Sequence, residues 1–279
     1  MLELLRYFGL PTVSASTQGP AIDHIIALIH WLMLILFVGW GVFFIYTLIR
    51  FRESNNPKAD HEGVKSHFSS YLEVAVAVFE VVLLIGFAFP IWASRVNDIP
   101  KGPEAVQIRV VAQQFAWNIH YPGSDGVFGK TSIDLVDEVE NPIGLDRSDE
   151  FAKDDVFTVN QLHIPVNTAI NISLSSKDVI HSFTLPELRV KQDAVPGMEI
   201  PVWFEATMTT EEFLQTTDGS AREGMGFEIA CAQLCGLGHY RMKGFLTIHD
   251  DEGYAAWHEE QQEYLAEEED DDWGDDEDW

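Results

Sequence analysis

The chain has 279 residues, 46% of them hydrophobic, and its 45 Asp and Glu against 17 Lys and Arg give a formal charge of −28. So acidic a surface repels phosphate groups, which excludes a protein that binds nucleic acid through the phosphate backbone. The two cysteines, Cys231 and Cys235, are too few for a disulfide-stapled secreted domain. Charge and hydrophobicity are segregated, because 16 acidic residues and no Lys or Arg lie from Asp250 onward.

The first predicted element is a membrane span over residues 24–49, a run of 26 residues without Asp, Glu, Lys or Arg. A helix needs about 20 predominantly apolar residues to cross a bilayer. The run begins too late and is too long for a secretory signal. Residues 1–21 before it are expected to form an uncleaved polar tail.

A second apolar run over residues 71–92 predicts the other half of a transmembrane helical hairpin that occupies residues 22–95. Four Lys and Arg lie between the two spans, against one in the N-terminal tail. The positive-inside bias therefore places the connecting loop in the cytoplasm and both chain ends outside it. Two carboxylates, Glu73 and Glu80, interrupt the second span, and ionisable groups inside a membrane are functional candidates.

Residues 104–250 change to short runs of strand-forming residues separated by turn-rich stretches, which predicts an all-β sandwich or barrel. The clearest runs are residues 106–119, 156–165, 169–174, 200–206 and 245–248.

Residues 122–155 are rich in Gly, Asp and Pro and are expected to form a long surface excursion. Residues 251–279 are acidic and of low complexity, which predicts a disordered tail.

The most informative stretch places Cys231, Cys235, His239 and Met242 within twelve residues. Thiolate and thioether ligands beside imidazole favour copper, whereas a structural zinc site has no use for Met. A mononuclear blue-copper site uses a single Cys. Two bridging thiolates can instead hold two copper ions, each of which then needs an imidazole. His181, at the end of a predicted strand, is the candidate for the second imidazole. A disulfide or a single adventitious metal site is the alternative.

This pattern, CxxxCGxxHxxM with an upstream DVxHS, resembles subunit II of the haem-copper cytochrome c oxidases over residues 22–250. The resemblance implies a membrane α+β protein in which a two-helix transmembrane hairpin precedes a cupredoxin-like Greek-key sandwich. It also implies a binuclear copper centre, called CuA, with two copper ions per chain. The implied ligands are His181, Cys231, the backbone carbonyl of Gln233, Cys235, His239 and Met242.

Two positions depart from the family pattern. The family usually has Glu at position 233, where the carboxylate reaches a Mg²⁺ shared with the catalytic subunit; Gln233 keeps the carbonyl but loses the charge, which puts the Mg²⁺ ligand in doubt. Phe115 and Trp117 match the aromatic segment that admits electrons from cytochrome c, and Phe115 stands where Trp is common. The alternative is that both rings are ordinary packing residues.

Other roles also follow from the resemblance. Asp178 and Asp193 match acidic positions where a basic cytochrome c docks, although Lys177 occupies a place often held by Glu. The acidic tail either adds to the field that attracts this donor or keeps the chain soluble. Glu73 matches the glutamate at the mouth of a proton channel, with a snorkelling interfacial residue as the alternative. Glu80 has no family counterpart, so a partner on the catalytic subunit is a hypothesis.

We therefore interpret the chain as the electron-accepting subunit of a respiratory cytochrome c oxidase in the inner (plasma) membrane, with its copper domain on the periplasmic side. Its expected partners are the haem-copper catalytic subunit I, subunit III, cytochrome c and membrane lipid. The complex reduces oxygen and translocates protons, and no catalytic residue lies on this chain. Two alternatives remain, the copper subunit of a nitric oxide reductase and a membrane-anchored copper-binding or delivery protein.

Overall fold

The computed structural model describes residues 1–8, 13–58, 61–63, 65–100, 102, 105–217 and 223–272. The chain forms two compact units. One, called here the hairpin unit, lies within Met1–Leu10 and Pro20–Asp98. The other, called here the β unit, lies within Pro11–Gly19 and Ile99–Trp279.

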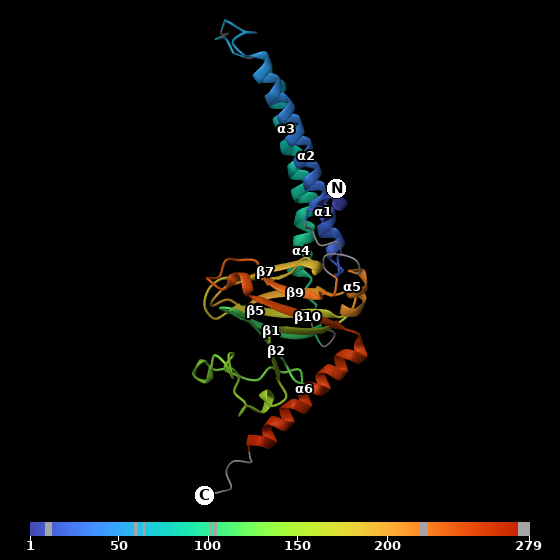
Figure 1. The fold of residues 1–279 in the computed structure, drawn as a ribbon, viewed down its shortest axis with the longest axis vertical. Helices are drawn as coiled ribbons and strands as arrows, with labels where there is room; N and C mark the ends of the chain where they lie inside the picture. The colour runs from blue at the N-terminus through green and yellow to red at the C-terminus, as the bar shows by residue number, and fades with distance from the viewer. Residues whose placement is uncertain are drawn as a thin grey trace. The chain divides into compact units, whose positions relative to one another are not determined.

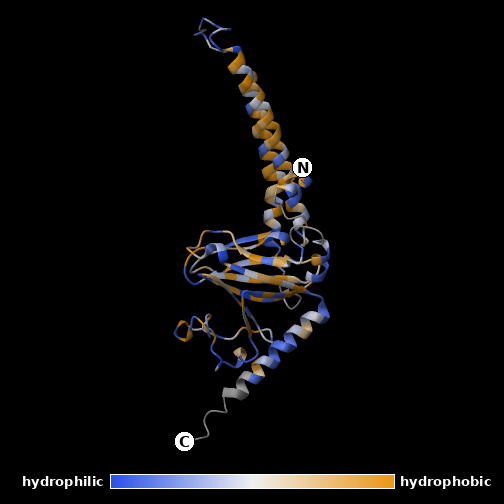
Figure 2. Ribbon diagram, in the orientation of Figure 1, coloured by the Kyte–Doolittle hydropathy of each residue, from blue (hydrophilic) through white to orange (hydrophobic). Residues whose placement is uncertain are grey.

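The hairpin unit is helical. It contains α1 (Leu2–Tyr7), α2 (Gly19–Arg50), α3 (Phe68–Leu83), the turn η1 (Leu84–Ala88) and α4 (Phe89–Asn97). Two continuous helical runs, Gly19–Arg50 and Phe68–Asn97, are long and apolar enough to cross a membrane (Figure 2). The rings of His24 on α2 and Phe87 on η1 lie 6.2 Å apart, so the two runs pack antiparallel at this end. The prediction of two apolar helices is confirmed.

The second run widens into a π-helical turn over η1, directly before Pro90. Proline donates no backbone hydrogen bond, and its ring collides with the carbonyl four residues earlier in a regular α-helix. A π-helical turn changes this geometry, because its hydrogen bonds reach one residue further along the chain. The helix therefore continues through Pro90 to Asn97.

The β unit is a sandwich of two five-stranded sheets (Figure 1). The order is β3-β2-β1-β5-β8 in the first sheet and β4-β10-β9-β6-β7 in the second. The strands are β1 (Ala105–Gln113), β2 (Ala116–Tyr121), β3 (Val156–Val159), β4 (Gln161–Pro165), β5 (Ala169–Ser176), β6 (His181–Leu185), β7 (Val190–Ala194), β8 (Ile200–Glu205), β9 (Phe227–Cys231) and β10 (Lys243–His249). Short helices complete the unit: η2 (Ile133–Leu135), η3 (Glu150–Ala152), η4 (Pro186–Leu188), α5 (Thr210–Thr216) and η5 (His239–Arg241).

The sandwich core follows from alternation along the strands. In β5 every second residue is buried, so Ile170, Ile172 and Leu174 point inward while their neighbours lie closer to solvent. The large side chains of Trp117 and Phe183 fill the same core cluster. Two apolar helices followed by a β-sheet domain are what the sequence predicts, and the fold class is confirmed.

The N-terminal segment differs from the polar tail expected over residues 1–21. Ser16 forms a β-bridge with Ala206, just beyond the edge strand β8. The Ala15 N–H donates to the carbonyl of Glu187 (2.8 Å), and the side chain of Ala15 is fully buried. A sheet edge offers unpaired backbone groups, and the segment before α2 satisfies them. The chain thus leaves the β unit at Gly19 and returns to it at Ile99.

The C-terminal region also differs from the predicted disorder, because residues Asp251–Asp272 form the helix α6. Trp257 is 8% exposed and stacks on His163 with ring centroids 4.5 Å apart. Tyr254, Trp257 and Leu265 recur at helical spacing and pack on the core cluster. The prediction of disorder rested on the acidic composition and overlooked these apolar residues at helical spacing. Residues 273–279 of the predicted tail lie outside the described residues.

The excursion between β2 and β3 is present as predicted and is anchored by a buried carboxylate. Asp155 is fully buried and accepts a hydrogen bond from His120 Nε2 at 2.6 Å. It also accepts from the backbone N–H groups of Gly123 (3.0 Å) and Gly129 (2.8 Å). A buried charge is tolerated where it is hydrogen-bonded in this way, so Asp155 holds both ends of the excursion.

Candidate metal centre

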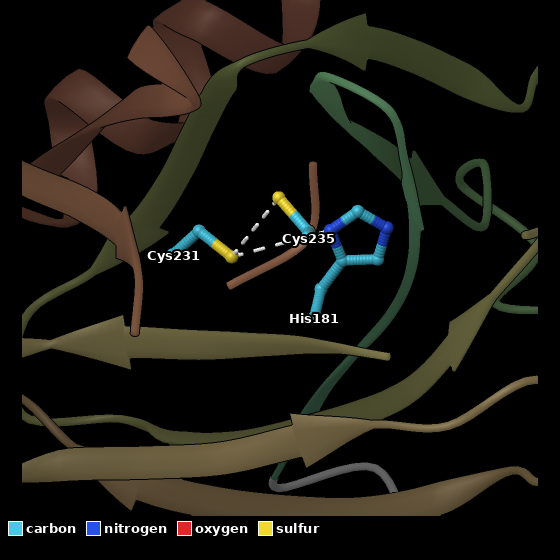
Figure 3. Close-up of side chains that lie close together, drawn as sticks. All are labelled: His181, Cys231 and Cys235. Atoms are coloured by element: carbon cyan, nitrogen blue, oxygen red, sulfur yellow. Dashed lines mark hydrogen bonds between the residues drawn. The ribbon is translucent and has the colours of Figure 1, made fainter. Parts of the chain in front are cut away.

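The candidate ligands come from one end of the second sheet. Cys231 ends β9, His181 begins β6, and the pairing of Phe183 with Cys231 sets these two strands side by side. Cys235 and His239 lie in the connection between β9 and β10. Met242 directly precedes β10. Figure 3 shows the side chains of His181, Cys231 and Cys235 turned toward one another.

The donor atoms converge. The sulfur atoms of Cys231 and Cys235 are 3.8 Å apart, and both residues are free cysteines. Cys231 Sγ lies 4.0 Å from His181 Nδ1, and Cys235 Sγ lies 3.6 Å from His239 Nδ1. Met242 Sδ lies 3.2 Å from His181 Nδ1 and 3.6 Å from Cys235 Sγ. Each sulfur of the cysteine pair thus has an imidazole nitrogen beside it.

The backbone carbonyl of Gln233 turns inward and accepts a hydrogen bond from the Cys231 thiol at 3.2 Å, while the residue itself is exposed. The carbonyl therefore completes the donor set that the sequence pattern suggests. All six residues of the predicted ligand set meet in one place.

Asp178 orients one of the two imidazoles. His181 Nε2 donates to Asp178 Oδ1 at 2.8 Å, which leaves Nδ1 facing the sulfur atoms. Asp178 also accepts from the backbone N–H groups of Gln114 (2.7 Å) and Val179 (2.6 Å). Burial acts to raise the pKa of Asp178, but the hydrogen bonds from His181 and the backbone outweigh it and hold this pKa below its usual value. A carboxylate behind a ligand imidazole fixes the ring's tautomer and orientation.

Cys235 is a thiol when no metal is bound. Burial raises its pKa to about 11, and the hydrogen bond and charge of Cys231 act in the same direction. Because a metal binds the thiolate, loading the site must release protons.

The donor set fits copper. His181, Cys231 and Cys235 offer ligand atoms that all lie within 4.8 Å of one another. Metal–sulfur bonds are about 2.3 Å long for ions of this size, so one ion can reach both sulfur atoms. Thiolate, imidazole and thioether donors together select copper among the common metals, and a buried Met is not a ligand of structural zinc.

Two aromatic residues flank the site in different ways. Phe115 is half-buried and lies against the loop between the ligands, where a Cβ at Gly238 would overlap its ring. The guanidinium of Arg241 lies 5.9 Å from the centre of that ring. Trp117 is fully buried and meets the His181 ring edge-on, with centroids 6.2 Å apart. Of the two, only Phe115 has surface exposed to a docking protein.

The sequence pattern did not indicate the role of Gln114. Its Nε2 donates to the carbonyl of Cys235 at 2.5 Å, and its backbone N–H binds Asp178. It thus ties the strand end beside Phe115 to the metal-binding loop. A polar side chain next to Phe115 was the only signal in the sequence, and it does not distinguish an exposed surface residue from one that hydrogen-bonds to the metal-binding loop.

The other predicted site residues do not join this cluster. Asp193 is exposed on β7, opposite Ser182 of β6. Glu73 and Glu80 lie on α3 in the hairpin unit, and both are exposed. Asp178, predicted as a docking residue, is engaged by His181.

The β unit matches a known family. The family model described as cytochrome c oxidase subunit II, periplasmic domain, matches residues 106–247, about half of the chain. The chain belongs to this family. It is therefore related to a subunit of the haem-copper respiratory oxidases, which are oxidoreductases, and the two apolar helices agree with a membrane-anchored subunit.

Individual relatives agree with this assignment. The chain is 29% identical to alternative cytochrome c oxidase subunit 2 of Bradyrhizobium diazoefficiens, over 88% of this chain and 82% of the relative. It is 29% identical to cytochrome c oxidase subunit 2 of Cereibacter sphaeroides, over 92% and 84%. Among solved structures, the periplasmic domain of subunit II of cytochrome oxidase from Bradyrhizobium japonicum is 28% identical, with a TM-score of 0.39, over 60% of this chain and 99% of that chain.

Proposed function

We propose that this chain is the electron-accepting subunit of a respiratory cytochrome c oxidase and holds a binuclear copper centre. The observation that carries the proposal is the pair of free thiols 3.8 Å apart with one imidazole nitrogen beside each sulfur. Bound there, two copper ions would supply a one-electron carrier between cytochrome c and the haem of the catalytic subunit.

The residues of the β unit fix the positions of the donor atoms. Cys231, Cys235, His181 and His239 would hold the copper ions through two thiolates and two imidazoles. Met242 and the carbonyl of Gln233 complete the set as weak donors. His181, Cys235 and Met242 are at most 3% exposed, whereas Cys231 and His239 are partly exposed. A ligand set held by paired strands changes little in geometry between oxidation states, which favours electron transfer over substrate chemistry.

The burial of His181, Cys235 and Met242 argues against copper delivery, because a delivery site needs exposed, exchangeable ligands. Nothing in the site favours a nitric oxide reductase, and the relatives described above are cytochrome c oxidase subunits. The oxidase is therefore the single function proposed.

The topology follows from chain connectivity and charge. Both ends of the hairpin join the β unit, so the two helical runs enter and leave the membrane on the same side. The basic loop between the runs places that loop in the cytoplasm. The β unit then lies on the periplasmic side of the inner membrane, where cytochrome c is the donor and subunits I and III are the membrane partners.

Four further roles belong to this proposal. Electrons enter by way of Phe115, with Trp117 behind it, and Asp193 contributes to docking of a basic cytochrome c. Asp178 orients His181 and, because the residue is exposed, is proposed to contribute to the same docking surface. A Mg²⁺ at the subunit interface would have to use the amide of Gln233, which is a poorer ligand than a carboxylate for a hard dication.

Glu73 is proposed at the mouth of a proton path. Glu73→Gln should slow proton-coupled reduction of the catalytic haem while copper is reduced by cytochrome c at the unaltered rate. Stopped-flow spectroscopy resolves the two steps. Unchanged haem reduction would remove Glu73 from the path.

The first test is a copper count combined with electron paramagnetic resonance on the detergent-solubilised full chain at partial oxidation. Two copper ions per chain and a seven-line hyperfine pattern are expected, because one electron is shared by two copper nuclei. A single copper with a four-line pattern, or copper lost readily to a chelator, would contradict the proposal.

A further inference from the structure

The outer face of the first sheet carries an arginine that no carboxylate of the chain neutralises. Ile108 and Val110 of β1 are buried in the core, so Arg109 between them points to the other face of the sheet. Its guanidinium lies over the ring of Phe128 in the excursion between β2 and β3, 4.1 Å from the ring centre. Among the residues that the structure describes, Arg109 forms no ion pair and no side-chain hydrogen bond. A half-buried cation of this kind favours the binding of a negative group.

A cavity of about 300 Å³ lies beside Arg109, between the sheet and the excursion. Two hydroxyl groups line it, from Ser175 on β5 and from Thr131 in the excursion. Neither hydroxyl has a hydrogen-bond partner within the described ranges of the chain. Val111 and Ile143 supply apolar parts of the lining. The cavity therefore collects hydrogen-bond donors from two strands and the excursion and leaves them without acceptors.

The strand register sets the positions of these groups. Arg109 lies opposite His120 on β2 and opposite Ser173 on β5, so the three residues form one row across the outer face. Ser175 is two residues further along β5 and shares this face. The hydrogen bond between His120 and the buried Asp155, at 2.6 Å, holds the β2 end of the row in place. The row is thus built on paired strands and does not depend on a loop for its position.

The carboxylates near the row are engaged elsewhere. Glu199 lines the far side of the cavity, where it accepts a hydrogen bond from the Ser173 hydroxyl and is exposed to solvent. Asp155 accepts from His120 and from two backbone N–H groups. Neither carboxylate pairs with Arg109, so the guanidinium remains available to a ligand.

We propose that Arg109, Ser175 and Thr131 form a binding site for a small oxyanion, either inorganic phosphate or the carboxylate of a short organic acid. A guanidinium offers two parallel N–H groups to a pair of oxygen atoms, and both anions present such a pair. The two hydroxyls donate to the remaining lone pairs. Because these donors come from β1, β5 and the excursion, the bound anion fastens the excursion to the sheet. The site belongs to the β unit alone and does not rest on the proposed function.

Equilibrium dialysis of the full chain in detergent tests the site. The probes are radiolabelled phosphate and radiolabelled butyrate, each at an ionic strength held constant with sodium chloride. One equivalent per chain is expected with at least one probe, and the probe that binds identifies the source of the oxyanion. Arg109→Met keeps an apolar side chain beside Phe128 but loses the charge, so the dissociation constant should rise about 10- to 100-fold. Binding of neither probe would overturn the proposal.

Two further variants separate the fork of Arg109 from its charge. Arg109→Lys keeps the charge without the paired N–H groups and should bind with an intermediate dissociation constant. Lys153→Met is the matched control, because Lys153 is exposed in the same excursion and its loss removes the same charge. This control should bind like the wild type. An equal loss in Lys153→Met and Arg109→Met, or undiminished binding in Arg109→Met, would mean an adventitious ion only.

Phenylglyoxal, which modifies guanidinium groups, gives a second measurement on the unaltered chain. Mass spectrometry follows the modification of Arg109 and, as a reference, of Arg52, which is exposed in the hairpin unit. The bound anion covers the guanidinium, so at about ten times its dissociation constant it should slow the modification of Arg109 about tenfold. The rate at Arg52 should not change. Equal rates at Arg109 with and without either anion would overturn the site.

Discussion

The β unit and the hairpin unit differ in how they treat their large apolar side chains: the β unit buries them and the hairpin unit exposes them. The β unit buries its own core, and its fully buried side chains include Trp117, Phe183 and Phe204. The hairpin exposes its large apolar residues; Trp40 and Phe44 of α2 are 60% and 61% exposed. The fold of the β unit is therefore stabilised by its own core. The hairpin exposes the apolar surface that a protein core would bury, so its stability depends on apolar surroundings.

The same contrast explains where the chemistry lies. A metal site needs donors fixed within a few tenths of an ångström, and paired strands over a packed core provide that precision. Donors on an isolated helical hairpin would depend on partners for their position. The hairpin instead carries single carboxylates, Glu73 and Glu80, on α3.

The largest expected effect is that of Cys235→Ser. A serine hydroxyl does not ionise to a soft bridging ligand, so copper should fall from two per chain to one or none and the shared-electron signal should vanish. Leu234→Ala is the matched control, because Leu234 lies between the two cysteines, is 78% exposed and offers no donor. Copper analysis and resonance spectra distinguish the two variants. A two-copper signal in Cys235→Ser would refute the bridging role.

Trp257→Ala tests whether α6 is part of the β unit. Removing a side chain that is 8% exposed and stacked on His163 should lower the free energy of unfolding of the β unit by about 3 kcal/mol. Tyr264→Ala, on the same helix but at a 60% exposed position, should change it by less than about 0.5 kcal/mol. Hydrogen exchange read by mass spectrometry should show the loss in β4 and β10 and none in the hairpin. Equal effects of both substitutions would mean that α6 does not stabilise the sandwich.

Asp178→Asn tests whether the carboxylate that is hydrogen-bonded to His181 contributes to copper affinity. The amide can no longer hold the charge-assisted hydrogen bond to His181 Nε2, so copper affinity should fall about 10- to 100-fold. Asp193→Asn removes the same charge from an exposed position on β7 and should leave affinity unchanged. Competition with a copper chelator measures both. If Asp193→Asn weakened copper equally, a general loss of negative charge would be responsible.

The smallest expected effect is on acid stability. Burial and the neighbouring His249 lower the pKa of His163 to about 4, and burial lowers the pKa of His249 despite the opposing charge of Asp250. The unfolded chain binds protons near pH 6.5 and the folded chain does not, so the free energy of unfolding should decrease as the pH falls from about 6.5 to about 4. Because His163 is only partly buried, the decrease should be about 1–2 kcal/mol.

Urea titrations at pH 7, 5.5 and 4 measure this decrease. His163→Asn should flatten the dependence over that range. A constant free energy of unfolding in the wild type between pH 6.5 and pH 4 would contradict the assigned pKa values.

Some features were predictable because they depend on local pattern. A run of 26 residues without Asp, Glu, Lys or Arg, most of them apolar, predicts a helix long enough to span a membrane, and alternating strand residues indicate a sandwich. The Cys, His and Met spacing indicated copper through the chemistry of its donors. By contrast, α6 was expected to be disordered because its net charge obscured an apolar face at Tyr254, Trp257 and Leu265.

The sequence by itself indicated the two apolar helices, the sandwich class and the donor cluster of Cys231, Cys235, His239 and Met242, since each follows from residue type and short-range spacing. The full ligand set, with His181 and the carbonyl of Gln233, was an expectation from the family resemblance. Only the tertiary structure showed that His181 lies beside Cys231 and forms a hydrogen bond with Asp178. It also showed that Trp117 is buried and that residues 13–18 lie along the sheet edge. These contacts join residues far apart in the chain. Their free energy depends on burial and hydrogen bonding that exist only once both sheets have assembled.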